Sequence, residues 1–366
     1  MKIYNPTTVF LENDAVKKYL STIPYSNVLI LTNNASSRLN HSLDDVMSVL
    51  ADKSVTLFDE VESNPSISTV LKVTRMVRNK NIDACIGIGG GSSIDAAKAV
   101  SLLLCYPDDA DIEELFYRER NAKHLPIIAI PTTCGTGSEV TPFSVLTDDR
   151  IGSKRTIFSQ LYPELALIDQ KYIKTLPYKV CLSTAVDALS HLIEASLSSR
   201  ANVYNCYYSH EGLKLFSDIK ESLISEKKYS IITDEVREKM MAMALFGGYA
   251  IASNGSSIPH GLANTITHEL NIPHGKSVIL FIPGYLRNYQ NQDTVSNILK
   301  LAGFESVTEL EDYLFNVVGC VKVPKQLWEN EIDKMMSNTH KLSSYPFEMT
   351  ADILRKYPSK IFAIKE

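Results

Sequence analysis

The chain has 366 residues, more than one hydrophobic core usually takes, and its 45% hydrophobic and 22% charged residues are typical of a globular protein, so two domains are expected. A formal net charge of −5 without a basic cluster argues against nucleic-acid binding. The chain starts without the apolar core of a signal peptide, has no apolar run of bilayer length and scatters six cysteines without CxxC spacing. We therefore expect a cytoplasmic protein with reduced cysteines and no membrane association.

The first half of the chain alternates short apolar segments with helix-like ones. Strands that alternate with helices pair in parallel, and the helices then cover both faces of the sheet. We predict a doubly wound parallel α/β domain at residues 1–176, of the kind that binds dinucleotides. The strand-like segments are 26–32, 54–61, 83–89, 125–131 and 164–169, and helical periodicity lies between them at 67–78 and 93–105.

The second half is helical. The turn-prone pair Leu176-Pro177 separates it from the last strand unit, so we predict an all-α domain at residues 177–366. Helices are predicted at 183–197, 210–224, 234–253 and 306–318.

Residues 89–91 are three consecutive glycines between a predicted strand and a helix that Ser92 or Ser93 caps. Backbone without Cβ atoms can approach an anion closely, and the first N–H groups of the helix point towards it, which predicts a phosphate or pyrophosphate site. The segment lacks the GK[ST] of a P-loop and has Ser92 where GxGxxG has its third glycine. The alternative is a plain strand-to-helix turn, in which Asp95 merely complements the helix dipole.

A second loop, 131–141, follows the next predicted strand and contains four threonines and two glycines. α/β folds bind ligands at the carboxyl ends of their strands, where these hydroxyl and backbone donors would lie. Serine- and threonine-rich turns also occur without a ligand. Two such loops in successive strand–helix units favour a dinucleotide over two unrelated turns.

A candidate metal site combines one carboxylate with histidines of the second half. Asp187 and His191 are four residues apart, which places them on one helix face, although such a pair more often only forms a hydrogen bond. His260 and His274 each stand between proline and glycine, where the chain bends. One carboxylate and three imidazoles would suit Fe²⁺, Zn²⁺ or another first-row divalent ion. We expect His268 to have a structural role.

Four ordered segments, GGGSSIDAAKA, PTTCGTGSEVT, VDALSHLIEA and IPHG…NIPHG, together with Asn64-Pro65, resemble the signature blocks of the iron-containing (group III) alcohol dehydrogenases. The resemblance runs from about residue 25 to about residue 290. It implies a dehydroquinate synthase-like fold and an enzyme that transfers a hydride between NAD(P)H and a small alcohol or aldehyde. A divalent metal would act as a Lewis acid on the substrate oxygen. It also implies a homodimer.

The resemblance implies roles for individual residues. The metal, Fe²⁺ or else Zn²⁺, would be held by Asp187, His191, His260 and His274, which would act in catalysis through it. Phe143 would lie close to the nicotinamide, and Arg155 competes with Lys154 for a basic position beside the cofactor. The residues implied to bind NAD or NADP are Asn33, Asn64, Gly90, Gly91, Ser92, Asp95, Thr132, Thr133, Thr136, Phe143 and Lys154.

The chain departs from the family pattern at three positions. Asn264 stands where many members have a second histidine, so a proton relay through that position is in doubt. Ala185 replaces a glycine that usually precedes the metal-binding aspartate. Asn33 stands where members that prefer NAD often have an aspartate, which would repel a 2′-phosphate, so both NAD and NADP stay open.

Two alternative activities remain, in addition to a non-catalytic nucleotide-binding module that would neither bind a metal nor turn over substrate. A dehydroquinate-synthase-like cyclase also pairs a nicotinamide with a metal, but it uses a Glu/His/His set and a strongly basic pocket. The IPHG…NIPHG segment also resembles the phosphonoacetaldehyde reductase subgroup, whose anionic aldehyde would need a basic residue in the substrate pocket. Lys154, Arg155 and Arg287 are the candidates for that residue.

Overall fold

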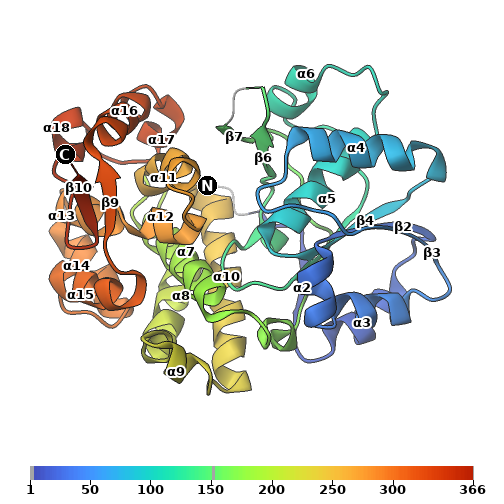
Figure 1. The fold of residues 1–366 in the computed structure, drawn as a ribbon, viewed down its shortest axis with the longest axis horizontal. Coiled ribbons are helices and arrows are strands. Elements are labelled where there is room, and N and C mark those ends of the chain that lie inside the picture. Colours follow the sequence, from blue (N-terminus) through green and yellow to red (C-terminus); the bar gives the residue numbers. More distant parts are fainter. Residues whose placement is uncertain (1–3, 151–152, 366) are drawn as a thin grey trace. The chain divides into compact units, whose positions relative to one another are not determined.

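The computed structural model describes residues 4–150 and 153–365. Contacts within the chain divide it into two compact units, Tyr4–Leu176 and a unit that begins at Pro177 (Figure 1). The first contains a parallel sheet covered by helices and the second is helical, so the predicted combination of an α/β domain with a helical domain is confirmed. Across these described residues, every helix is too short or too polar to cross a membrane.

Six parallel strands form the sheet of the first unit. In spatial order they are β1 (Thr8–Leu11), β8 (Leu165–Ile168), β5 (Ile127–Pro131), β4 (Ala84–Gly89), β2 (Asn27–Thr32) and β3 (Ser54–Phe58). The central strands β4 and β5 are buried throughout, which explains their continuous apolar sequences. The edge strand β1 is more exposed and is absent from the sequence prediction.

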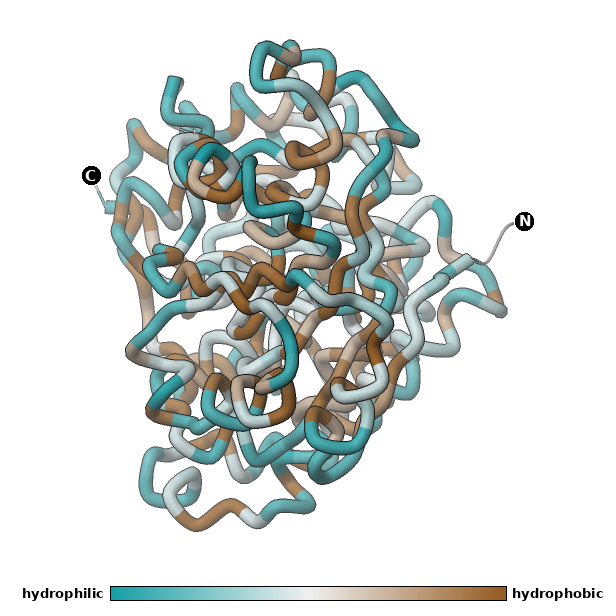
Figure 2. The backbone as a smooth tube through the Cα atoms, turned by 90° about the vertical axis from the view of Figure 1, so that its right-hand side faces the viewer, coloured by the Kyte–Doolittle hydropathy of each residue, from teal (hydrophilic) through white to brown (hydrophobic). Residues whose placement is uncertain are grey.

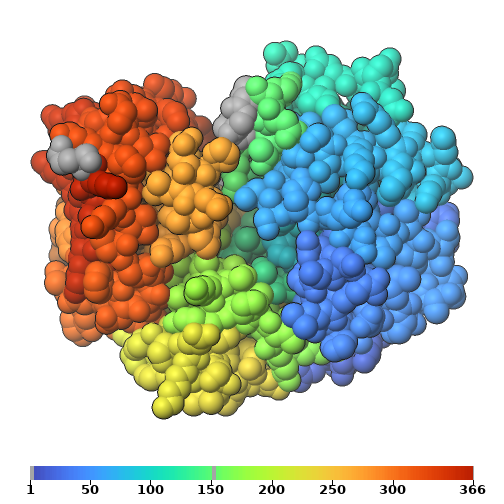
Figure 3. Space-filling model, viewed as in Figure 1, coloured from blue at the N-terminus to red at the C-terminus, as the bar shows by residue number. Residues whose placement is uncertain are grey.

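Helices cover both faces of this sheet. Leu29 and Leu31 of β2 belong to one buried apolar cluster, to which α4 (Ile67–Val77) and α5 (Gly91–Leu103) contribute. Val28 and Ile30 belong to a second cluster, with α1 (Ala15–Tyr19) and α3 (Ser42–Val49). Figure 2 shows hydrophobic and hydrophilic stretches alternating along the backbone, and segments that include α3 and α4 form much of the visible surface of this unit in Figure 3.

Smaller elements complete the first unit. The antiparallel pair β6–β7 is not predicted from the sequence, and it pairs Thr147 with Lys154. The remaining elements are the helices α2 (Asn34–Leu39) and α6 (Ile112–Tyr117), the strands β6 (Val145–Asp148) and β7 (Ser153–Thr156), and the 3₁₀ turns η1 (Leu20–Thr22), η2 (Arg78–Lys80), η3 (Ser138–Val140) and η4 (Gln170–Ile173).

The helical unit is built around α7 (Tyr178–Ser196), which is buried over most of its length. It packs against α8 (Cys206–Ile219), α10 (Asp234–Asn254) and α12 (His274–Ile279). A helix surrounded by other helices is apolar on all sides, so the polar residues of α7 stand out. The other elements are α9 (Glu226–Tyr229), α11 (Ile258–Glu269), α13 (Ile282–Arg287), α14 (Gln292–Leu301), α15 (Val307–Val318), α16 (Lys325–Met336), α17 (Thr339–Ser343), α18 (Ala351–Leu354), η5 (Lys220–Leu223) and the parallel pair β9 (Val321–Pro324) and β10 (Phe362–Lys365).

Candidate metal centre and cofactor loops

Helix α7 carries the first two predicted metal ligands. Asp187 and His191 lie one turn apart and are almost completely buried, with 4% and 6% of their surface exposed. Burial of a carboxylate is costly unless a positive or hydrogen-bonding partner faces it. His191 of the same helix and the histidines of two other helices, His260 and His274, are the groups that face Asp187.

His260 comes from the first turn of α11, which Pro259 helps to begin. Its Nε2 atom lies 3.5 Å from Oδ1 of Asp187. The ring of His260 stacks on that of His191, with centroids 4.5 Å apart and an interplanar angle of 16°. One potential ligand atom from each of Asp187, His191 and His260 lies within 4.8 Å of the other two. The structure therefore brings together three of the four residues proposed from the sequence as a compact donor set.

His274 is the first residue of α12 and lies beside this set rather than within it. Its ring centroid is 5.7 Å from that of His260, and its Nδ1 lies 3.3 Å from the hydroxyl of Thr267. Gly275 explains how α12 comes so close, because a Cβ atom there would lie 1.9 Å from the carbonyl oxygen of Ser183 on α7. Only glycine permits this contact between two backbones.

The charges of the site are mutually stabilising. Burial acts to raise the pKa of Asp187, but the imidazoles of His191, His274 and His260 hold it below its ordinary value. Burial acts to lower the pKa of His260, but the carboxylates of Glu194 and Asp187 raise it to about 9. Within the described residues, neither Oδ1 of Asp187 nor Nε2 of His260 makes a hydrogen bond. One carboxylate with neighbouring imidazoles is a donor set that fits a first-row divalent cation.

Two other residues of α11, His268 and Asn264, lie apart from this set. His268 is exposed on α11, 3.9 Å from the carboxylate of Glu269. Asn264 is half-buried on the same helix. Glu194, by contrast, was given no role from the sequence, although it follows Asp187 and His191 on the same face of α7. The signal that points to it is the spacing of four and then three residues, which continues one helical stripe.

The two glycine-rich loops pack directly on each other. Gly90 precedes α5 and Gly91 begins it, and the helix has no side-chain cap. A Cβ atom at Gly90 would lie 3.1 Å from Cγ2 of Thr133, and one at Gly91 would lie 3.0 Å from Cγ2 of Thr136. The N–H of Thr132 donates to the carbonyl oxygen of Gly89 at 2.8 Å. Uncapped N–H groups and threonine hydroxyls thus meet at the carboxyl ends of β4 and β5, an arrangement that suits a pyrophosphate.

Asn64 and Asn33 occupy the neighbouring connections. The N–H of Asn64 donates to the hydroxyl of Ser92 at 3.1 Å, which ties this residue to the first glycine loop. Asn33 is exposed directly after β2 and caps α2, where its side chain accepts from the N–H of Ser36 at 3.4 Å. Its amide donates to the carbonyl oxygen of Val61 at 3.2 Å.

Asp95 is engaged in a buried network beneath the second loop. One of its oxygens accepts from the hydroxyl of Ser138 at 2.5 Å and lies 3.6 Å from Nζ of Lys98, and the other accepts from the N–H of Val145 at 3.0 Å. Lys98 also donates to the carbonyl oxygen of Phe143 at 2.7 Å. Asp95 and Phe143 therefore belong to the scaffold that shapes the loop, and contact with a cofactor stays a prediction for both.

The basic candidates differ in their surroundings. Arg155 forms ion pairs with Glu113 at 3.2 Å and Asp148 at 3.1 Å and lies 3.4 Å over the ring of Tyr117. Arg287 is paired with Glu311. Lys154 is half-buried on β7.

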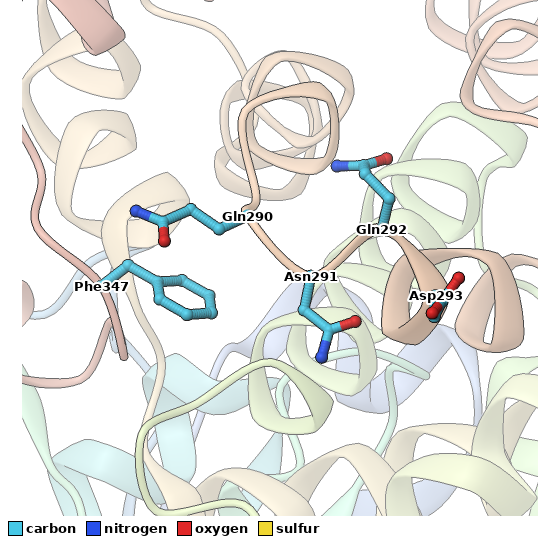
Figure 4. A pocket seen from close by; sticks show the side chains of 5 residues that line it. All are labelled: Gln290, Asn291, Gln292, Asp293 and Phe347. Atoms are coloured by element: carbon cyan, nitrogen blue, oxygen red, sulfur yellow. The ribbon is translucent and has the colours of Figure 1, made fainter.

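A depression of about 450 Å³ lies elsewhere in the helical unit (Figure 4). Figure 4 shows the side chains of the five residues that line it. Its lining consists of amides, one carboxylate and one aromatic ring, and it includes none of the predicted site residues. The lining residues are Gln290, Asn291, Gln292, Asp293 and Phe347.

Comparisons with known proteins agree with this geometry. The model of the iron-containing alcohol dehydrogenases matches residues 6–170, and that of the C-terminal region of the Fe-containing alcohol dehydrogenase family matches 181–350. An iron-containing alcohol dehydrogenase from Thermotoga maritima is 33% identical, with a TM-score of 0.88 over 97% of this chain and 98% of that one. A sulfoacetaldehyde reductase from Bifidobacterium kashiwanohense, solved with NAD⁺, is 25% identical, with a TM-score of 0.84 over 96% of both chains.

A longer protein is also similar. Aldehyde-alcohol dehydrogenase 2 of Entamoeba histolytica is 32% identical over 298 residues, which are 77% of this chain and 33% of that protein. The chain thus spans about a third of the length of the first curated relatives that it matches. The likeness to the Thermotoga maritima enzyme, by contrast, extends over nearly the whole of both chains. The chain belongs to the iron-containing alcohol dehydrogenase family.

Proposed function

We propose that the chain is a metal-dependent alcohol dehydrogenase that interconverts small alcohols and aldehydes with NAD(P)H. The observation that carries this proposal is the convergence of Asp187, His191 and His260, whose ligand atoms lie within 4.8 Å of one another. When bound, the divalent cation supplies Lewis-acid polarisation of the substrate oxygen, and the nicotinamide supplies or accepts the hydride. Membership of a dehydrogenase family favours this reaction over the cyclase alternative.

Different residues of the chain are proposed to set the charge of the metal site and to hold the cofactor. With a divalent cation bound, Asp187 would supply the one negative charge among the donors and the imidazoles would be uncharged, so the site would keep a net positive charge that favours a negatively charged oxygen. Burial of these side chains keeps bulk water away and strengthens their electrostatic interactions. His274, beside them, is proposed as the fourth ligand. In the other unit, the uncapped start of α5 and the hydroxyls of Thr133 and Thr136 are proposed to hold the cofactor phosphates.

Metal analysis and a cofactor assay together test this function. Purified protein of known metal content is mixed with NADH or NADPH and a panel of short aldehydes, and the absorbance of the reduced cofactor is followed. Asp187→Ala should lose both metal and turnover, because the site then lacks its carboxylate. Asp218→Ala is the matched control, since this exposed residue of α8 only pairs with Lys239 at 3.0 Å. Bound metal without oxidation of either cofactor by any aldehyde would contradict the proposal.

An anionic aldehyde is a second candidate substrate. The similarity to a sulfoacetaldehyde reductase favours it. The ion pairs of Arg155 and Arg287 oppose it, because a paired guanidinium attracts an anion less strongly. Lys154 is the residue to test, because the family resemblance places it beside the cofactor. Phosphonoacetaldehyde and sulfoacetaldehyde should be compared with propionaldehyde by kcat/KM. If an anionic aldehyde is the better substrate and Lys154→Met removes only that advantage, this second candidate holds.

The assembly of the protein is inferred from the family resemblance, and its location from the six cysteines, which are scattered without CxxC spacing. We infer a homodimer in the cytoplasm. Light scattering on the purified chain tests the first inference, and a monomer at micromolar concentration would contradict it.

A further inference from the structure

Glu194 is a buried carboxylate behind the metal centre. It lies on α7 one turn beyond His191, and none of its surface is exposed. One of its oxygens accepts a hydrogen bond from Nδ1 of His260, and the other accepts one from the backbone N–H of Ser257. Both donors come from the beginning of α11. A single carboxylate therefore joins the helix that carries Asp187 and His191 to the helix that carries His260.

These two hydrogen bonds determine which nitrogen of His260 faces the site. In a neutral imidazole one nitrogen carries the proton and the other has the lone pair. A histidine must be neutral to bind a metal. Because an ionised carboxylate can only accept, the neutral His260 keeps its proton on Nδ1 and has its lone pair on Nε2, the atom 3.5 Å from Asp187 Oδ1. The bond from Ser257 holds the start of α11 in place, so it also sets the position of the ring relative to α7.

Glu194 is unsuited to be a metal ligand itself. Among the described residues, the potential ligand atoms that lie within 4.8 Å of one another belong to Asp187, His191 and His260, and each oxygen of Glu194 instead accepts a hydrogen bond from the beginning of α11. A histidine that binds a metal through one nitrogen commonly donates from the other nitrogen to a carboxylate, which orients the ring and makes it a stronger donor. The geometry of Glu194 and His260 matches that arrangement.

We propose that Glu194 is a positioning residue of the metal centre, which fixes the tautomer and orientation of His260 so that its Nε2 binds the divalent cation together with Asp187 and His191. This inference rests on the proposed metal-dependent function. It assigns Glu194 a specific effect on metal affinity, beyond the stabilisation that any buried and hydrogen-bonded carboxylate gives to its surroundings.

Metal affinity of Glu194→Gln tests the proposal. The glutamine has one acceptor oxygen for two donors, so its NH₂ group must face either Ser257 or His260 and one hydrogen bond is lost. Zn²⁺ binding to the metal-stripped protein is measured by competition with a chromophoric chelator, and Co²⁺ binding by its visible absorption. We expect affinity to fall by about 10- to 100-fold, the usual effect of removing such a partner, and the Co²⁺ spectrum to change because a donor nitrogen is displaced.

Glu311→Gln provides a matched control in the same unit. Glu311 is also buried, and it also accepts from one backbone N–H, that of Lys360, and from one side chain, that of Arg287. The substitution makes the same chemical change away from the predicted ligands. It should lower the melting temperature and leave the Zn²⁺ affinity and the Co²⁺ spectrum as they are in the unaltered protein.

The outcomes separate this inference from the proposed function. Equal Zn²⁺ affinities for Glu194→Gln and Glu311→Gln, with unchanged Co²⁺ spectra, would overturn the role of Glu194. If the unaltered protein binds neither ion, the metal centre itself is refuted. Should Glu194→Gln fail to fold, Glu194→Asp serves instead, since its shorter side chain keeps the charge but cannot reach both donors. It should also bind Zn²⁺ more weakly than Glu311→Gln does.

Discussion

Replacing Lys98 with methionine should destabilise the α/β unit by about 3–5 kcal/mol, the usual cost of removing one partner from a buried ion pair. Lys98 is fully buried on α5. Its ammonium group donates to the carbonyl oxygens of Ser138 at 2.8 Å and Phe143 at 2.7 Å and to the hydroxyl of Ser138 at 2.8 Å, and it lies 3.6 Å from Asp95. Methionine keeps the apolar stem and removes every one of these donors.

The magnitude follows from the groups that are left behind. Each buried carbonyl that loses its donor costs about 1–3 kcal/mol, and the carboxylate of Asp95 loses its countercharge. Burial lowers the pKa of Lys98 to about 8, against the opposing effect of Asp95 and Glu139. Since the unfolded state then binds more protons than the native state between about pH 8 and the ordinary value of 10.5, the contribution of Lys98 to stability rises with pH in that window. The methionine variant should lack this rise.

Urea unfolding checks the prediction. Far-UV circular dichroism follows both units, and the fluorescence of Trp328, the single tryptophan, reports the helical unit alone. Lys72→Met is the matched control, because Lys72 is exposed on α4 and its pair with Glu60, 3.1 Å apart, should contribute less than about 1 kcal/mol. If both variants unfold at the same urea concentration, the buried ion pair does not stabilise the fold as argued.

Two further predictions concern pH and cofactor choice. Burial raises the pKa of Glu139 from 4.5 to about 7. Between these pH values the native state binds more protons than the unfolded state, so the protein loses about 3 kcal/mol of stability as the pH rises through this window. Glu139→Gln should remove that loss, which urea unfolding at pH 5 and pH 8 would reveal; an unchanged pH dependence would contradict it. Asn33→Asp should lower kcat/KM for NADPH more than for NADH, because an acid repels the 2′-phosphate and still caps α2. Equal effects on both cofactors would place Asn33 away from the ribose.

Local patterns predict the α/β and helical halves because hydrophobic periodicity depends only on neighbours in the chain. The strand order has a different origin. β1 lies beside β8, with Thr8 opposite Leu165, and such a pairing between distant segments leaves no trace in either segment alone. The β6–β7 pair is hidden for a related reason, since its strands are short and carry charged residues such as Arg155, one of whose partners, Glu113, is distant in sequence.

The partners of Lys98 beneath the cofactor loops are a feature that sequence patterns do not predict. A lysine three residues after an aspartate looks like an ordinary surface pair on a helix. The other residues around it, Ala96, Ala97, Ala99 and Val100, are small or apolar, and this composition is the available sign that the lysine is buried. What the sequence could not show is that its partners are backbone carbonyls of the second loop, since any residue type can supply a carbonyl.

The candidate metal centre combines residues that share one helix with residues that other helices bring near. Asp187, His191 and Glu194 share one rigid helix, so their spacing alone places them on one face, and sequence reasoning could have found all three. His260 and His274 stand at the beginnings of two other helices, and their distance from α7 depends on how closely those helices pack. Gly275 allows that approach for α12, and the bonds to Glu194 hold α11. Helix spacing therefore predicts the ligands on α7, whereas the positions of the ligands on α11 and α12 depend on how these helices pack. Glu194 connects the two groups, because it lies on α7 and binds the beginning of α11.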